Sequence, residues 1–65
     1  MMKDYPRAIE DLERAAALDP GDPAVYYKLG LVYLKTGQVG PSSKNFKKAA
    51  DLGMEEALKF LPGAQ

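Results

Sequence analysis

The chain has 65 residues and a mass of 7.1 kDa, so it can form one small domain that buries only about 60% of its unfolded surface. It contains no cysteine, histidine or tryptophan, which excludes disulfides, Cys/His zinc sites and catalytic triads that use His or Cys. Nine Lys and Arg balance nine Asp and Glu, and a pI near 6.1 argues against a basic nucleic-acid binder or a binder of anionic membranes.

Hydrophobic residues make up 46% of the chain and charged residues 28%, which is typical of a globular protein rather than a disordered one. Uninterrupted apolar runs reach only three to four residues, too few to cross a membrane. The first residues lack the apolar stretch of a secretion signal. We therefore expect a small soluble module in the cytoplasm that needs neither a metal nor a cofactor.

The first predicted helix covers residues 4–18. Asp4 is a candidate N-cap, and Pro6 falls in the first turn, where its missing N–H costs no helical hydrogen bond. Small and large apolar residues recur at helical spacing and form one stripe, made of Ala8, Leu12, Ala15 and Ala16.

The second predicted helix covers residues 23–36. It follows the helix-breaking sequence Asp-Pro-Gly-Asp at 19–22, in which Asp22 is the next candidate N-cap, and Pro23 takes the first helical position. Gly37 is expected to end the helix in the left-handed conformation that glycine adopts without strain.

Residues 38–41 are expected to form a turn before a third helix at about 41–52, which Gly53 would end. A short fourth helix is predicted at 54–61, because two glutamates stand in its first turn, where the helix dipole favours negative charge, and a Pro-Gly pair follows it. No segment has the alternation of a strand. The sequence therefore predicts an all-α protein of about four helices.

The chain also matches itself at an offset of 34 residues. Six small or apolar positions recur in register, pairing Tyr5 with Val39, Ala8 with Ser42, Leu12 with Phe46, Ala15 with Ala49, Ala16 with Ala50 and Leu18 with Leu52. Small residues let helix axes approach closely while large ones fill the gaps beside them. Core packing is accordingly the expected role of most of these positions.

The spacing in the second and third helices resembles that of the tetratricopeptide repeat (TPR), and the residues that carry it are Tyr26, Leu29, Gly30, Tyr33, Gly37, Ser42, Phe46, Ala49 and Leu52. The resemblance implies antiparallel helical hairpins of an α-solenoid. Within a single module spanning 1–65, it implies a full repeat at 23–53, a second-helix half repeat at 4–20 and a capping or following helix at 54–61.

Two departures from the family pattern concern helix ends. Met54 stands where the family usually has the proline that Pro20 supplies, which leaves the last turn less sharply specified. Gly40 and Pro41 are expected to delay the start of the third helix. Neither departure affects the predicted hairpin.

The second helix carries the candidate binding surface. Between Ala24 and Leu34 only Lys28 and Gly30 are neither apolar nor aromatic, and a helix that is apolar all round should be buried all round. One stripe, formed by Tyr26, Leu29 and Tyr33, is expected to face the flanking helices. The other stripe is the candidate protein-binding face, made of Ala24, Tyr27, Leu31, Leu34 and Lys35.

In the resembled family this second stripe lies on the concave groove that receives peptides. Some members hold a C-terminal carboxylate there with a Lys/Asn/Arg clamp, but the corresponding positions here are Ala24, Tyr27, Lys28 and Leu31. The resemblance therefore implies an apolar or amphipathic helical ligand. Packing of Leu31 and Leu34 under the fourth helix and a neighbouring copy is the alternative.

Charge along the chain bears on the partner. Residues 1–19 hold three basic and five acidic groups, whereas residues 41–53 hold three basic and one acidic. Complementary ends suit head-to-tail stacking, so we expect a homo-oligomer or a scaffold that binds another protein or peptide. RNA binding is the alternative function, disfavoured because no aromatic residues interleave with the lysines of the third helix. The paired carboxylates, Glu10 with Glu13 and Asp51 with Glu55, lie on faces expected to be solvated, so we do not expect an enzyme.

Overall fold

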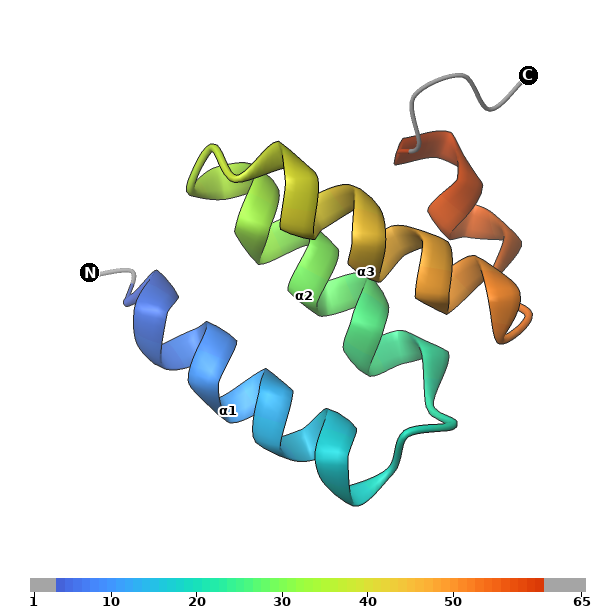
Figure 1. The fold of residues 1–65 in the computed structure, drawn as a ribbon, viewed down its shortest axis with the longest axis horizontal. Coiled ribbons are helices and arrows are strands. Elements are labelled where there is room, and N and C mark those ends of the chain that lie inside the picture. Colours follow the sequence, from blue (N-terminus) through green and yellow to red (C-terminus); the bar gives the residue numbers. More distant parts are fainter. Residues whose placement is uncertain (1–3, 61–65) are drawn as a thin grey trace.

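A computed structural model describes residues 4–60, and all regular structure within this range is helical. Three α-helices, α1 (Tyr5–Leu18), α2 (Pro23–Lys35) and α3 (Val39–Asp51), are followed by a 3₁₀ helix, η1 (Glu55–Phe60). Each α-helix runs antiparallel to the one before it, and α2 lies between α1 and α3 (Figure 1). The prediction of an all-α fold of antiparallel hairpins is confirmed.

The helices begin where the predicted capping residues stand. The Asp4 carboxylate accepts a hydrogen bond from the Arg7 amide at 3.1 Å, and the Asp22 carboxylate accepts one from the Ala24 amide at 3.0 Å. Each bond satisfies an amide of the first turn that has no partner inside the helix. Both α1 and α2 also carry a proline at their first or second position.

The helices α2 and α3 end in the same way. Gly37 and Gly53 have φ angles of 78° and 110°, a region in which only glycine is unstrained. After Gly53, the Met54 amide donates to the carbonyl of Ala49 at 3.0 Å. After Gly37, the Gln38 amide donates in the same way to the carbonyl of Tyr33 at 2.9 Å, which closes the end of α2. This Schellman geometry fixes both turns. The second turn is therefore well defined even though Met54 stands where the family usually has proline.

The predicted start of the third helix is wrong by two residues. Gly40 and Pro41 were expected to delay it, but α3 begins at Val39. The first amide that the helix uses is that of Ser42, which donates to the Gln38 carbonyl at 3.1 Å. Because Pro41 stands in the first turn, its missing N–H removes no helical hydrogen bond.

The fourth helix is also corrected. The short helix predicted at 54–61 is a 3₁₀ helix over Glu55–Phe60, so the chain has three α-helices rather than four, and residue 61 and the Pro-Gly pair after it lie outside the described residues. Tighter 3₁₀ hydrogen bonding is common in such short pieces. One side of η1 still contributes to the core, because Ala57 is fully buried.

The core lies mainly between α2 and α3. Phe46 is 0% exposed, and its ring lies so close to Gly30 that a Cβ on that glycine would stand 2.7 Å from ring carbons. The Ser42 hydroxyl, also buried, donates to the Gly30 carbonyl at 2.8 Å. The alternation of small and large residues therefore lets α2 and α3 approach closely.

Candidate protein-binding surfaces

The predicted binding face lies along α2 and is not uniformly exposed. Leu34 is 40% exposed and Lys35 is exposed beside it, at the C-terminal end of the helix. Ala24, Tyr27 and Leu31 are half-buried. The open part of this face is therefore concentrated at its C-terminal end.

The half-buried members of this face also pack inward. The ring of Tyr27 meets Phe46 edge to face, with ring centroids 5.7 Å apart and planes inclined by 66°. Leu31 packs against the buried cluster that Phe46 forms with Ala49 and Ala57. Tyr27 and Leu31 thus contribute to the core while part of each side chain remains at the surface.

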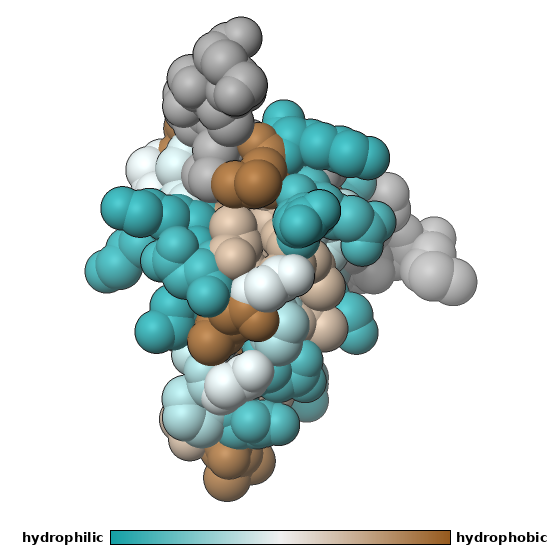
Figure 2. Space-filling view, turned by 90° about the vertical axis from the view of Figure 1, so that its right-hand side faces the viewer, coloured by the Kyte–Doolittle hydropathy of each residue, from teal (hydrophilic) through white to brown (hydrophobic). Residues whose placement is uncertain are grey.

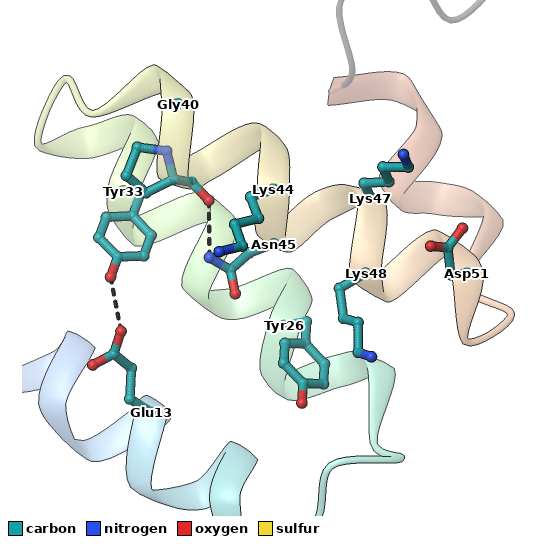
Figure 3. A pocket seen from close by; sticks show the side chains of 10 residues that line it. Glu13, Tyr26, Tyr33, Gly40, Lys44, Asn45, Lys47, Lys48 and Asp51 are labelled. Atoms are coloured by element: carbon teal, nitrogen blue, oxygen red, sulfur yellow. Dashed lines mark hydrogen bonds between the residues drawn. The ribbon is translucent and has the colours of Figure 1, made fainter.

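The three residues of the stripe expected to face the flanking helices differ in how deeply they are buried. Leu29 is almost completely buried. Tyr26 and Tyr33 are half-buried and line an open groove of about 740 Å³. We call this the tyrosine–lysine groove; Figure 3 shows it between α1, α2 and α3, and its lining residues are Glu13, Tyr26, Tyr33, Gly40, Pro41, Lys44, Asn45, Lys47, Lys48 and Asp51.

Polar contacts hold the walls of the tyrosine–lysine groove. The Tyr33 hydroxyl donates to Oε2 of Glu13 at 2.9 Å and so connects α2 to α1 (Figure 3). The side-chain amide of Asn45 donates to the Pro41 carbonyl at 2.8 Å, within the α3 wall. The ammonium group of Lys48 lies 5.9 Å from the centroid of the Tyr26 ring, within the range of a cation–π contact.

The Tyr33 hydroxyl has a raised pKa in the folded chain. Desolvation by partial burial raises the pKa of Tyr33 above its ordinary value of 10.0, and the hydrogen bond to Glu13 and the negative charge of that carboxylate raise it further. Each of these causes disfavours the ionised phenolate. Tyr33 therefore remains a hydrogen-bond donor to Glu13 at neutral pH.

Sequence reasoning missed this groove. It assigned Tyr26 and Tyr33 to packing, and it found no aromatic residues between the lysines because it considered α3 alone. The structure brings aromatic residues of α2 to the same groove as Lys44, Lys47 and Lys48 of α3. The helical spacing could have indicated part of it. Tyr26 and Tyr33 are two turns apart and so share one face of the second helix, and Lys44 and Lys48 are one turn apart and so share one face of the third.

A further apolar surface lies at the end of the molecule that carries η1. Figure 2 looks onto this end, and apolar residues form a broken strip down it between hydrophilic margins. Leu52, which caps α3, and Leu58 of η1 are both exposed.

Residues 4–60 show neither a metal site made of carboxylates nor a membrane-spanning helix. No three carboxylates in this range lie close enough together to hold a metal ion. None of the helices described there combines the length and the apolar character that crossing a bilayer requires.

Comparison with known families gives two matches along the chain. A family model described as "TPR repeat" matches residues 2–37, more than half of the chain, and one described as "Tetratricopeptide repeat" matches residues 23–52. Searches of curated proteins and of solved structures gave no significant match. The second family model covers α2 and α3, the hairpin in which Phe46 packs onto Gly30. The chain belongs to the tetratricopeptide repeat family.

Proposed function

We propose that this chain binds a partner protein through the α2 face, made of Ala24, Tyr27, Leu31, Leu34 and Lys35, and that the ligand is an apolar or amphipathic helical segment. TPR repeats generally mediate protein–protein interactions or scaffolding, and proteins that contain them are typically not enzymes. The proposal adds to this general role a surface and a class of ligand.

The exposure of Leu34 is the observation that supports this surface most directly. Leu34 is 40% exposed, so a ligand that covers it removes apolar surface from water. Each Å² removed stabilises the complex by roughly 25 cal/mol. Tyr27 and Leu31 extend the surface from Leu34 at helical spacing, and both are partly accessible. Tyr27 is the proposed anchor, because a rigid aromatic ring gives large contact area with few rotatable bonds.

Self-association is the alternative use of the same apolar surfaces. Leu52 and Leu58 are exposed at the η1 end, in addition to Leu34 on α2. Stacking of a second copy would cover such residues, and the acidic character of α1 against the basic α3 would favour one relative orientation. This alternative is separated from peptide binding by the mass of the particle in solution.

The experiment uses a labelled amphipathic peptide of leucine and lysine, which adopts a helix with one apolar face. Leu34→Lys is the informative variant, since Leu34 lies outside the buried cluster and lysine is a good helix former. Leu31→Asp is less suitable because Leu31 packs against that cluster, so a charge there would unfold the protein. Leu18→Lys is the matched control, because Leu18 is 84% exposed and lies on α1.

We expect Leu34→Lys to weaken peptide binding at least about tenfold and Leu18→Lys to leave it unchanged, with equal helicity in both. Sedimentation of the parent without peptide measures self-association in parallel. A dimer that Leu34→Lys converts to monomer would support the self-association alternative. Equal peptide binding by parent and Leu34→Lys, together with unchanged mass, would contradict the proposed surface.

A further inference from the structure

The tyrosine–lysine groove differs chemically from the α2 face. One of its walls, on α3, carries Lys44, Lys47 and Lys48 with a single carboxylate, Asp51. Within residues 4–60 none of these lysines forms an ion pair. The groove therefore has a basic wall whose charges are available to a ligand.

The other parts of the groove are already fixed by internal contacts. Glu13, on the α1 side, accepts the Tyr33 hydroxyl bond at 2.9 Å. That bond holds the Tyr33 ring in place between α1 and α3, as the close-up shows (Figure 3). The Tyr26 ring lies under the ammonium group of Lys48 at 5.9 Å. A ligand thus meets a partly ordered aromatic surface next to the basic wall, at a reduced entropy cost.

We propose that the tyrosine–lysine groove binds an acidic segment of a partner protein. Carboxylates of the segment pair with Lys44 and Lys48, which lie one turn apart on α3, and an apolar or aromatic residue of the segment packs on Tyr26 and Tyr33. The volume of about 740 Å³ accommodates a few side chains. The occupant is a peptide of opposite charge to the wall, and charge complementarity sets its orientation.

The charges of the groove favour an acidic peptide over a nucleic acid. Glu13 and Asp51 place two carboxylates among the lining residues, where they would repel a continuous phosphate backbone. A peptide avoids this repulsion because its acidic side chains are separate and can face the lysines alone. The zero net charge of the whole chain also gives no long-range attraction to nucleic acid.

This inference adds a second surface to the proposed function. The α2 face and the tyrosine–lysine groove share no residue, although α2 contributes to both. On α2 the groove uses Tyr26 and Tyr33, whereas the α2 face is centred on Leu31 and Leu34. The two surfaces call for ligands of different chemistry, one apolar and one acidic, so each can be tested without the other.

The probe is a short fluorescein-labelled peptide of glutamate, aspartate and phenylalanine, with binding measured by fluorescence anisotropy at low and high salt. We expect the double variant Lys44→Glu/Lys48→Glu to weaken binding at least about tenfold, because two attractive contacts become repulsive. The matched control, Lys28→Glu/Lys59→Glu, makes an equal charge change at two exposed positions outside the groove, and it should leave the affinity within about twofold.

A second measurement does not depend on substitutions at the lysines. Titration of the parent chain with the same peptide should shift the NMR ring signals of Tyr26 and Tyr33 before those of Tyr5 on α1. Failure of the parent to bind the peptide at low salt would overturn the proposal. Equal losses in Lys44→Glu/Lys48→Glu and in Lys28→Glu/Lys59→Glu would also overturn it. So would tighter binding of a labelled oligouridine, which would assign the groove to nucleic acid.

Discussion

The two helix pairs of this chain are held together in different ways. Between α2 and α3 the contact is dense, since Phe46 is fully buried against Gly30 and Ser42 reaches the Gly30 carbonyl. By contrast α1, which is described along its whole length, buries no residue completely. Its contact with α2 uses half-buried side chains and the surface hydrogen bond from Tyr33 to Glu13.

This difference assigns stability and binding to different parts of the chain. The α2–α3 pair has the close packing of a protein interior, in which a change of one methylene alters the free energy of unfolding. The α1–α2 pair leaves an open groove, and the residues lining it are those available to a ligand. We therefore expect the α2–α3 pair to determine global stability and α1 to open first.

The largest expected effect is that of Phe46→Ala at the centre of the dense pair. Removing a fully buried phenylalanine costs about 3–5 kcal/mol, about as much as the core of a domain of this size contributes in total. We expect the variant to lose most of its helical circular dichroism at room temperature. Val39→Ala, at a position 59% exposed on the same helix, is the control and should melt like the parent. A cooperative parent-like melt of Phe46→Ala would refute the dense pair as the source of stability.

The second prediction compares two glycines. Gly30→Ala places a Cβ at 2.7 Å from the Phe46 ring, which has no space to move because it is buried, so we expect a loss of about 1–3 kcal/mol. Gly40→Ala is the matched control, because nothing lies within 4 Å of its added Cβ in α3. Because Gly40 precedes Pro41, whose ring disfavours a Cβ on a preceding helical residue, the gain of up to about 1 kcal/mol that alanine brings to a helix is offset, and we expect a smaller effect than at Gly30. Urea denaturation measures both, and equal effects at the two positions would contradict the packing described.

The contrast between these glycines also shows what the sequence could predict. The packing of small against large residues, with Ser42 and Phe46 among them, was expected from their helical spacing, and the helix end at Gly37 from the position of glycine after an apolar helix. Both depend on neighbouring residues in the chain or on helical spacing. The start of α3 was misplaced because Gly40 and Pro41 are read as helix breakers, although both fit the first turn, where their backbone properties have little cost.

The binding surfaces depend on how far each helix is rotated about its axis, which the sequence pattern only partly determines. Tyr26 shares a helical face with Leu29, and the pattern could not show that Leu29 is buried while Tyr26 lines a groove. The meeting of Lys48 with Tyr26 involves two helices and is set by the packing of α3 on α2. Such juxtapositions follow from tertiary packing rather than from local propensity.

The third prediction concerns the N-caps of α1 and α2. Asp4→Ala and Asp22→Ala each remove a carboxylate that accepts a hydrogen bond from the first turn, at a cost of about 1 kcal/mol. Loss of the Asp22 cap should lower global stability, because α2 belongs to the dense pair. Loss of the Asp4 cap should instead speed amide hydrogen exchange within α1 and change the global melt little. If both substitutions lowered the global melt equally, α1 would be as firmly attached as α3.

The smallest expected effect concerns the bond that connects α1 to α2. Tyr33→Phe removes the hydroxyl that donates to Glu13 at 2.9 Å, and because the site is exposed the cost at pH 7 should be at most about 1 kcal/mol. The folded chain raises the pKa of Tyr33 above 10.0 through partial burial and the Glu13 carboxylate. The associated stability is therefore fully present below pH 10.0 and is lost as the pH rises through the raised value.

Thermal melts between pH 8 and pH 11 test this dependence on Tyr33. Other groups also titrate in this interval, so the informative quantity is the difference between the parent and Tyr33→Phe. That difference should shrink towards zero or change sign as the phenolate forms beside the Glu13 carboxylate, since two negative charges then face each other. Glu13→Gln is the control, because it removes the charge but keeps an oxygen that accepts the hydroxyl bond, and it should move the alkaline loss to lower pH. A difference that stays constant across the interval would mean that folding does not raise the pKa of Tyr33, which would contradict its bond to the Glu13 carboxylate.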